Sequence, residues 1–184
     1  MVNTNQKIST KTLTTGAILT ALVIVLQWIG SSFLTFGGLA ISLVLLPIVL
    51  GAALCGPFMG LWLGLVFSII VLSGPDAAWF MGFSIAGTFI TVLAKGILCG
   101  FIAGLVYRYA KKINQNLAVV LAAVICPVVN TGVFVLGCYV FFQGEVLQTV
   151  MTVYLLINFV IELCVNLVLS PLLFRLLSYK KKQA

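Results

Sequence analysis

The sequence predicts an all-α integral membrane protein: a bundle of six transmembrane helices with both termini in the cytoplasm. Of its 184 residues, 62% are hydrophobic and 7% are charged, and the mean hydropathy is +1.27. This leaves too little polar surface for a water-soluble globule. The ten Lys and Arg outnumber the three acidic residues and cluster mostly at the ends of apolar segments, as expected for orientation in a bilayer. We expect residues 1–184 to form a single membrane domain.

The first apolar run covers about residues 13–36, after a short polar and basic segment. A signal peptide is the competing interpretation. The run is, however, longer than the apolar core of such peptides, and no clear cleavage motif is followed by a soluble domain. We therefore expect a first transmembrane helix, which Gly37 and Gly38 end.

The next apolar stretch, residues 39–73, is interrupted only at Gly56-Pro57. A single helix of that length would measure about 50 Å, which is too long for one crossing. Two short helices at about 39–55 and 57–73 fit better, because a proline at the first helical position sacrifices no hydrogen bond.

Three more apolar runs follow, and they predict helices at about residues 85–107, 117–142 and 150–177. The basic clusters at 7–11, 108–112 and 180–182 share one side of the membrane only if four helices precede the middle cluster and two follow it. The opposite side carries no Lys or Arg, so the positive-inside rule predicts cytoplasmic termini.

Small residues indicate where two of these helices meet. Gly56, Gly60 and Gly64 recur at every fourth position in the third helix, and the series 96, 100 and 104 does the same in the fourth. Such series allow close backbone approach in membranes. We expect the two helices to be tight at their cytoplasmic ends and splayed outside, leaving an outward-facing cavity.

Polar groups inside the membrane carry the functional argument. Lys95, Asn130 and Glu162 fall at a similar depth in three different predicted helices when 1.5 Å is counted per residue, and charges there are costly unless they face the interior. Lys95 and Glu162 are compatible with an ion pair that holds the bundle together, with direct ligand contact, or with both. Asn130 follows Pro127 in its helix and is compatible with interhelical packing or with a ligand site.

The last helix carries a polar stripe at every fourth position, which puts an aromatic hydroxyl, two amides and a carboxylate on one face: Tyr154, Asn158, Glu162 and Asn166. The stripe fits interhelical hydrogen bonding or a hydrated pocket, and its alignment with Lys95 and Asn130 favours the pocket. Gln27 and Trp28 lie in the outer half of the first helix and can add to its wall. Trp28 is equally suited to anchor at the membrane interface.

The residue inventory argues against catalysis by this chain. It has no histidine, and two of its three acidic residues, Asp76 and Glu145, lie in predicted outer loops, so paired carboxylates, histidine-bound zinc and Ser-His dyads are absent. The five cysteines are scattered without a Cys-x-x-Cys pair, which argues against a metal site, and no nucleotide-binding motif occurs. We expect neither catalytic residues nor a cofactor, and no nucleic-acid partner.

Several short motifs stand out, namely Thr-Thr-Gly-Ala-Ile-Leu-Thr-Ala-Leu in the first helix, Leu-Leu-Pro-Ile-Val-Leu-Gly-Ala-Ala-Leu-Cys-Gly-Pro-Phe-Met-Gly, Ala-Lys-Gly, and Pro-Val-Val-Asn-Thr-Gly-Val-Phe. Together they resemble the substrate-binding S component of an energy-coupling factor (ECF) vitamin transporter. The resemblance spans nearly the whole chain. It implies a six-helix bundle that captures a vitamin from outside and associates with a transmembrane coupling subunit and two cytoplasmic ATPases.

The resemblance also assigns roles to residues. Ala17 and Ala21 match the small-residue motif by which the family's first helix docks on the coupling subunit, although packing within this bundle explains the same spacing. The loops at 31–38 and 74–84 match those that close the family's pocket. In the second loop, a sharp turn and an apolar lid form the expected gate, made by Gly74, Pro75, Trp79 and Phe80.

We therefore expect a substrate-binding subunit of an importer in a bacterial cytoplasmic membrane. The single buried lysine suits an anionic vitamin, with pantothenate the first choice, although a Glu162 that neutralises Lys95 would weaken that assignment. A self-sufficient small-solute carrier and a membrane scaffold are the alternatives. The expected substrate-binding residues are Gln27, Trp79, Lys95, Asn130, Tyr154, Asn158 and Glu162.

Overall fold

The fold is helical apart from one short hairpin in the residues that the computed structural model describes, which are 10–33, 35–36, 39–40, 43–142 and 158–182. The elements in chain order are α1 (Thr10–Phe33), β1 (Thr35–Phe36), β2 (Leu39–Ala40), α2 (Leu45–Cys55), α3 (Pro57–Leu72), α4 (Pro75–Met81), α5 (Ile85–Ala110), α6 (Gln115–Phe141) and α8 (Phe159–Lys182).

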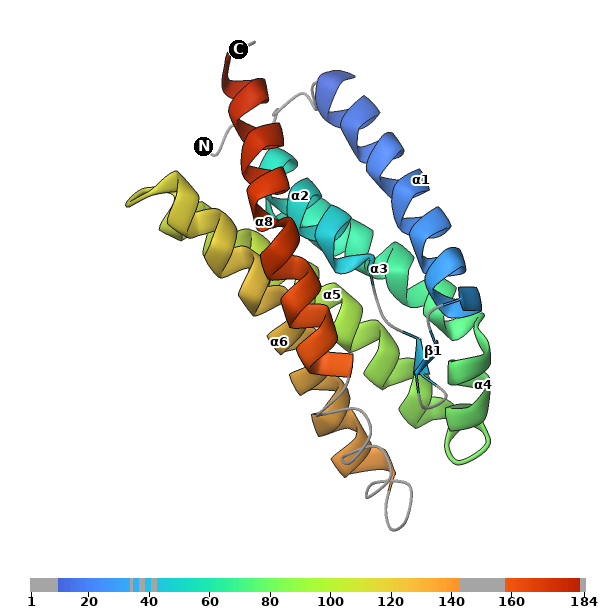
Figure 1. Cartoon of the computed structure of the whole chain (residues 1–184). Coiled ribbons are helices and arrows are strands. Elements are labelled where there is room, and N and C mark those ends of the chain that lie inside the picture. The colour runs from blue at the N-terminus through green and yellow to red at the C-terminus, as the bar shows by residue number, and fades with distance from the viewer. Residues whose placement is uncertain (1–9, 34, 37–38, 41–42, 143–157, 183–184) are drawn as a thin grey trace, which may run out of the picture.

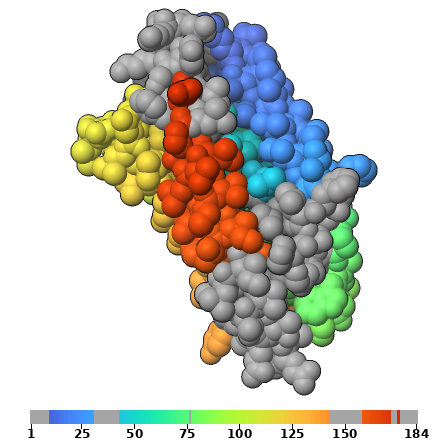
Figure 2. Space-filling view, in the orientation of Figure 1, coloured from blue at the N-terminus to red at the C-terminus, as the bar shows by residue number. Residues whose placement is uncertain are grey.

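The helices lie lengthwise in a bundle with two distinct ends (Figure 1). The start of α1 and the end of α8 lie at one end, whereas the hairpin and α4 lie at the other. Helix α5 packs between α3 and α6, and α8 packs on α6 and α2. In the space-filling view, α8 covers the face between α6 and α2 (Figure 2).

The break between α2 and α3 falls where the sequence predicts it. Helix α2 ends at Cys55, Gly56 adopts a φ of 99°, and Pro57 is the first residue of α3. That φ lies in the region that side chains with a Cβ rarely enter, so glycine suits the turn. Proline at this position costs no hydrogen bond, because the first N–H of a helix has no partner within the helix.

Helices α3 and α5 approach closely through their glycines, as expected. A Cβ on Gly64 would overlap the backbone carbonyl of Gly96, and one on Gly60 would overlap that of Gly100. One turn further on, the Ser68 hydroxyl donates to the carbonyl oxygen of Val92 at 2.8 Å. Helices α3 and α5 are therefore held together by close glycine packing and, one turn away, by a hydrogen bond between them.

The expected glycine series is wrong at one position. Gly56 has nothing within 4 Å of a built Cβ, because it forms the turn. Pro57 takes its place opposite Gly104, whose Cβ would lie 2.6 Å from the Pro57 Cα. Helices α5 and α6 also approach closely at their other end, where a Cβ on Gly87 would lie 2.6 Å from that of Phe141. The splaying and the outward cavity stay predictions.

An apolar core fills the bundle between these contacts. Its fully buried members come from α1, α2, α3, α5 and α6 and include Val23, Leu45, Ile48, Leu63, Phe67, Cys99, Ala103, Ala118 and Cys126. Where the unfolded chain would be in water, burial of such side chains is the largest favourable contribution to folding. In lipid, tight packing and interhelical hydrogen bonds replace it.

Two loop segments differ from the sequence prediction. Leu39 and Ala40 precede α2 instead of belonging to it, because they pair with Phe36 and Thr35 in an antiparallel hairpin, and α2 begins only at Leu45. The segment 74–84, predicted as a loop, contains helix α4, with Pro75 in its first turn. The other predicted boundaries shift by a few residues, and the start of the sixth predicted helix lies outside the described residues.

Within the part of the chain that the structure describes, three helices are long and apolar enough to cross a membrane: Thr10–Gly30 within α1, then α5 and α6. Three shorter helical segments are also apolar, namely Leu45–Cys55, Pro57–Leu72 and Phe159–Pro171. Large hydrophobic side chains point outward along the bundle, including Ile18, Phe58, Val128 and Val168. An apolar exterior of this kind is what lipid contact requires.

Candidate ligand-binding site

One face of α8 is polar and buried. Asn158, directly before α8, is 1% exposed, Glu162 is 4% exposed, and Asn166 and Ser170 are also buried at the next two turns. The predicted stripe is therefore confirmed for the asparagines and Glu162 and continues to Ser170, which the sequence analysis did not single out. Tyr154, the first predicted member, lies outside the described residues.

The stripe meets α6 at Asn130. The Asn130 amide nitrogen Nδ2 donates to the Glu162 carboxylate oxygen Oε2 at 3.5 Å, and both residues are buried. Because α6 and α8 run in opposite directions, this contact fixes their register. Asn158 then lies one turn further along, level with Phe134.

Lys95 reaches the same level from α5. Thr91 packs against Gly137, so the antiparallel register of α5 and α6 puts Lys95 next to Phe134. The Lys95 ammonium lies 4.8 Å from the centroid of the Phe134 ring and 5.8 Å from that of Phe67. Aromatic faces at this range attract cations.

Lys95, Asn130, Asn158 and Glu162, which we call the polar layer, thus come together from α5, α6 and α8. Their formal charges cancel, since they include one cation and one anion. All four are buried in a bundle with an apolar exterior. Buried ionisable groups in such a bundle mark ligand or ion sites by default.

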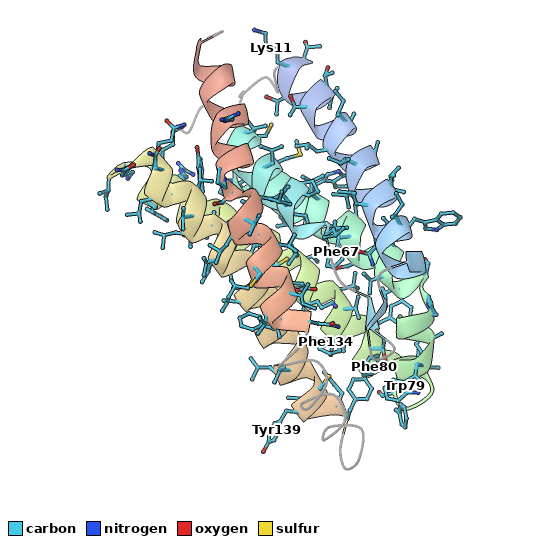
Figure 3. The ribbon with its side chains drawn as sticks, in the orientation of Figure 1. Lys11, Phe67, Trp79, Phe80, Phe134 and Tyr139 are labelled. Carbon is cyan, nitrogen blue, oxygen red and sulfur yellow. The ribbon has the colours of Figure 1, made fainter. Side chains whose placement is uncertain are left out.

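Aromatic rings connect the polar layer with α4. Phe80 of α4 is buried, and its ring centroid lies 5.4 Å from that of Phe134 and 5.5 Å from that of Phe142. In Figure 3, Phe134, Phe80 and Trp79 lie in the half of the molecule away from the start of α1. The polar layer is therefore covered by α4 from the end opposite Lys11.

Trp79 does not reach the layer itself. It is 49% exposed, and its ring packs edge-on against Phe80 at 4.9 Å and Phe83 at 5.0 Å. The predicted direct contact of Trp79 with the substrate therefore has no support from this geometry. Phe80, which the sequence analysis assigned only to the gate, is the α4 aromatic ring that points inward.

Several buried polar atoms lack hydrogen-bond partners within the described part of the chain. They are Gln27 Oε1, Thr91 Oγ1, Asn130 Oδ1, both amide atoms of Asn158, and Asn166 Oδ1. Each unmade hydrogen bond of this kind costs about 1–3 kcal/mol, and native proteins carry few of them. A concentration of them on and beside the polar layer indicates that a further polar group belongs there.

Gln27 is buried on α1, as expected of a wall residue, whereas the neighbouring Trp28 is 74% exposed. Since Thr20 contacts Trp62, the register of α1 on α3 puts Gln27 level with Ile69, about half a turn beyond Phe67 toward α4. Gln27 therefore approaches from the opposite side of the bundle. Trp28 faces outward, so it does not line the wall.

Sequence reasoning missed the aromatic and hydroxyl neighbours of the layer. Phe134 lies four residues after Asn130, and Thr91 lies four residues before Lys95, so each shares a helix face with a predicted site residue. That four-residue spacing could have identified Phe134 and Thr91 from the sequence. Nothing in the sequence marks Phe67, since it lies in a continuous apolar run.

The small residues of α1 lie on its outer surface. Ala17 and Ala21 are both exposed, whereas Gly16, Leu19 and Val23 form the face that packs into the bundle. Packing inside this bundle, the alternative explanation of the spacing, is therefore wrong. Ala17 and Ala21 leave a shallow strip between larger exposed side chains such as Ile18 and Leu22.

Among the described residues, no group of three His, Cys, Asp or Glu side chains is placed to hold a metal ion. The cysteines are free thiols, with Cys99, Cys126 and Cys138 buried. Among the described residues, the buried polar groups are amides, hydroxyls, one ammonium and one carboxylate, and aromatic rings lie beside them. Such groups bind small polar molecules by hydrogen bonds, charge and ring contact.

The apolar helices and the buried polar layer define an integral membrane protein with a polar interior suited to a small solute. The family model described as "ECF transporter, substrate-specific component" matches residues 11–174. The chain belongs to this family, which makes it a substrate-specific membrane subunit of a transporter, as the sequence motifs indicated. No curated protein and no solved structure matches the chain.

Proposed function

We propose that this chain captures a water-soluble vitamin or related micronutrient from outside the cell and passes it inward with a coupling module. The polar layer carries the proposal. In a subunit whose family recognises a substrate, the buried amide atoms that lack partners within the described residues are best explained as ligand contacts, namely Asn130 Oδ1 and both amide atoms of Asn158. A scaffold would gain nothing from such atoms, because unsatisfied polar groups lower stability.

The membrane arrangement that we propose has six crossings and both termini in the cytoplasm. The shorter apolar helices α2 and α3 each supply one crossing in this arrangement. Its support is the grouping of exposed Lys11, Arg108, Lys111 and Lys112 at the end of the bundle where α1 starts and α8 finishes. Positive charge of this kind favours the cytoplasmic side of a bacterial membrane.

The ligand contacts that we propose are Lys95, Asn130, Asn158 and Glu162, with Gln27 as a wall residue. Tyr154 stays a candidate by its position four residues before Asn158. Pantothenate is the first candidate because Lys95 suits its carboxylate. The buried Glu162 already supplies a negative charge to the layer, so a neutral or zwitterionic vitamin competes with it.

Access to the layer is proposed to depend on α4 and its flanking turns. Gly74 and Pro75 begin the segment, and Phe80 packs over Phe134 at 5.4 Å. Helix α4 is short, and its Trp79 ring is half-exposed on the outer side, so α4 can lift without unfolding the longer helices. Covering loops or short helices of this kind commonly control access to a site.

Coupling is proposed to use the strip at Ala17 and Ala21. Two exposed alanines one turn apart permit close approach of another helix. The partner that we propose is a transmembrane coupling subunit, driven by two cytoplasmic ATPase subunits. ATP hydrolysis would then take place in those partners.

Native mass spectrometry of the protein purified from its own membrane tests this proposal. We expect a small polar molecule and at least one coupling subunit to accompany the chain. If the chain purifies alone and transports the same solute into vesicles without any ATPase, a self-sufficient carrier replaces the proposal.

A further inference from the structure

The direction of two buried amides is fixed by what they donate to. Asn130 Nδ2 donates to the Glu162 carboxylate at 3.5 Å, and Asn166 Nδ2 donates to the Glu162 backbone carbonyl at 2.8 Å. A carbonyl or an ionised carboxylate only accepts hydrogen bonds. Turning either amide over would set oxygen against oxygen, so both must keep their nitrogens toward Glu162.

Both amides therefore keep a carbonyl oxygen for another use. Asn130 Oδ1 and Asn166 Oδ1 are buried and lack hydrogen-bond partners within the described residues. Asn166 lies one turn below Glu162 and Asn130 lies beside it. Glu162 thus acts as a positioning residue that turns two acceptor oxygens into the interior.

Asn158, one turn on the other side of Glu162, adds one acceptor and one donor, since neither amide atom has a partner in the described part of the chain. The asparagines of the stripe and Asn130 together offer three open carbonyl oxygens against one open amide nitrogen. A molecule that satisfies them must bring more hydrogen-bond donors than acceptors to this side of the site.

The charges of the polar layer also favour a ligand without a phosphate group. Lys95 is the one Lys or Arg between residues 12 and 107, and no further Lys or Arg occurs between 113 and 174. Glu162 offsets its charge within the same layer. Phosphate groups are normally held by several Arg, Lys or backbone N–H donors, and the polar layer offers no such cluster.

We propose that the ligand, which the proposed function takes to be a vitamin, is recognised in its unphosphorylated form through neutral N–H or O–H donors given to the carbonyl oxygens of Asn130 and Asn158. Asn166 Oδ1 accepts a third hydrogen bond, either from the ligand or from a water molecule between the ligand and Asn166. Besides its proposed ligand contact, Glu162 orients two amides, that of Asn130 through its carboxylate and that of Asn166 through its backbone carbonyl. The site then selects ligands by the number of N–H and O–H donors that they present to these oxygens.

The first test uses the unaltered full-length chain in detergent. The probe is an equimolar mixture of pantothenate, pyridoxine, thiamin and riboflavin with their phosphorylated forms, and native mass spectrometry reads the mass that is retained. We expect an unphosphorylated compound with at least two N–H or O–H donors. Retention of a phosphorylated compound overturns the inference and leaves the proposed function intact. Retention of none, by a chain that also carries no small molecule when purified from its own membrane, overturns the proposed function and with it the inference.

The second test asks which atom of Asn158 the retained probe uses. Asn158→Asp keeps an acceptor oxygen and loses the donor, whereas Asn158→Leu loses both in a similar volume. We expect the Leu variant to weaken binding of the retained probe about 10- to 100-fold, as for a donor left unpaired, and the Asp variant to weaken it much less. Asn116→Asp, at an exposed site, controls for the added charge.

Equal or greater loss in Asn158→Asp than in Asn158→Leu would show that the site uses the amide nitrogen, and the inference would be wrong. Thermal unfolding of each variant separates lost binding from lost folding. The probe comparison needs no variant, so it decides the matter even if Asn158→Asp does not fold.

Discussion

Asn130 on α6 and Glu162 on α8 are joined by a buried hydrogen bond, with Nδ2 and Oε2 3.5 Å apart. This contact ties together two helices and also orients the Asn130 amide. It lies in the interior of a bundle whose exterior is apolar, where water is scarce and a lost partner is not easily replaced.

Removing the Glu162 acceptor should therefore destabilise the bundle. We expect Glu162→Leu to lower the free energy of unfolding by about 1–3 kcal/mol, the cost of leaving a buried donor unsatisfied. Glu162→Gln retains an acceptor oxygen for Asn130 and should cost less. Thermal unfolding in detergent measures both. Equal losses in the two variants would mean that the charge of Glu162, and not its acceptor oxygen, matters for stability.

The glycine contact between α3 and α5 should be intolerant of even one methyl group. Gly64→Ala puts a Cβ into the carbonyl of Gly96, so the helices must separate, and we expect a clear drop in the unfolding temperature. Gly132→Ala is the matched control, because its Cβ meets nothing within 4 Å. Alanine there should stabilise α6 by up to about 1 kcal/mol. A stable Gly64→Ala variant would refute the close packing.

Phe80 and Trp79 are neighbours in α4 with different surroundings, which makes them a matched pair. Phe80→Ala removes a buried ring from Phe134 and Phe142 and should release α4, so hydrogen exchange in residues 75–81 rises and ligand affinity falls. Trp79→Ala removes a half-exposed ring and should change both much less. If the two substitutions have the same effect, the assignment of Phe80 as the inward contact fails.

Substitutions on the outer strip of α1 should separate binding from transport. Ala17→Trp or Ala21→Trp fills the strip, so we expect ligand binding by the isolated protein to persist while uptake by cells is lost. Leu22→Trp exchanges one large exposed side chain for another and serves as the control. Persistent uptake with both alanines replaced would contradict coupling through this strip. Loss of folding would instead mean that α1 packs differently.

The long elements could be predicted from the sequence because their signals are local. A proline after a glycine marks the start of α3, and regular spacing of small or polar residues marks the contact faces of α3, α5 and α8. Gly56 shows the limit of spacing alone. It fits the series, yet the same glycine supplies the positive φ of a turn, and the two roles exclude each other.

The short elements could not be predicted in the same way. Apolar periodicity does not distinguish a two-residue strand from the start of a helix, and the hairpin at 35–40 depends on pairing that spacing does not record. Likewise, which of Trp79 and Phe80 points inward depends on the rotation of α4. In the site, the polar members were found because polarity in an apolar run is conspicuous, whereas Phe67 and Phe134 lacked that contrast.

Isothermal titration calorimetry on Asn130→Ala and Asn158→Ala tests the central claim, that the polar layer binds the ligand. The titrant is the compound that the unaltered protein retains, and Asn116→Ala is the exposed control. We predict that both buried substitutions weaken binding about 10-fold or more while the control does not, with all three proteins folded. Unchanged affinity in Asn130→Ala and Asn158→Ala would contradict the account and move the binding site away from the polar layer.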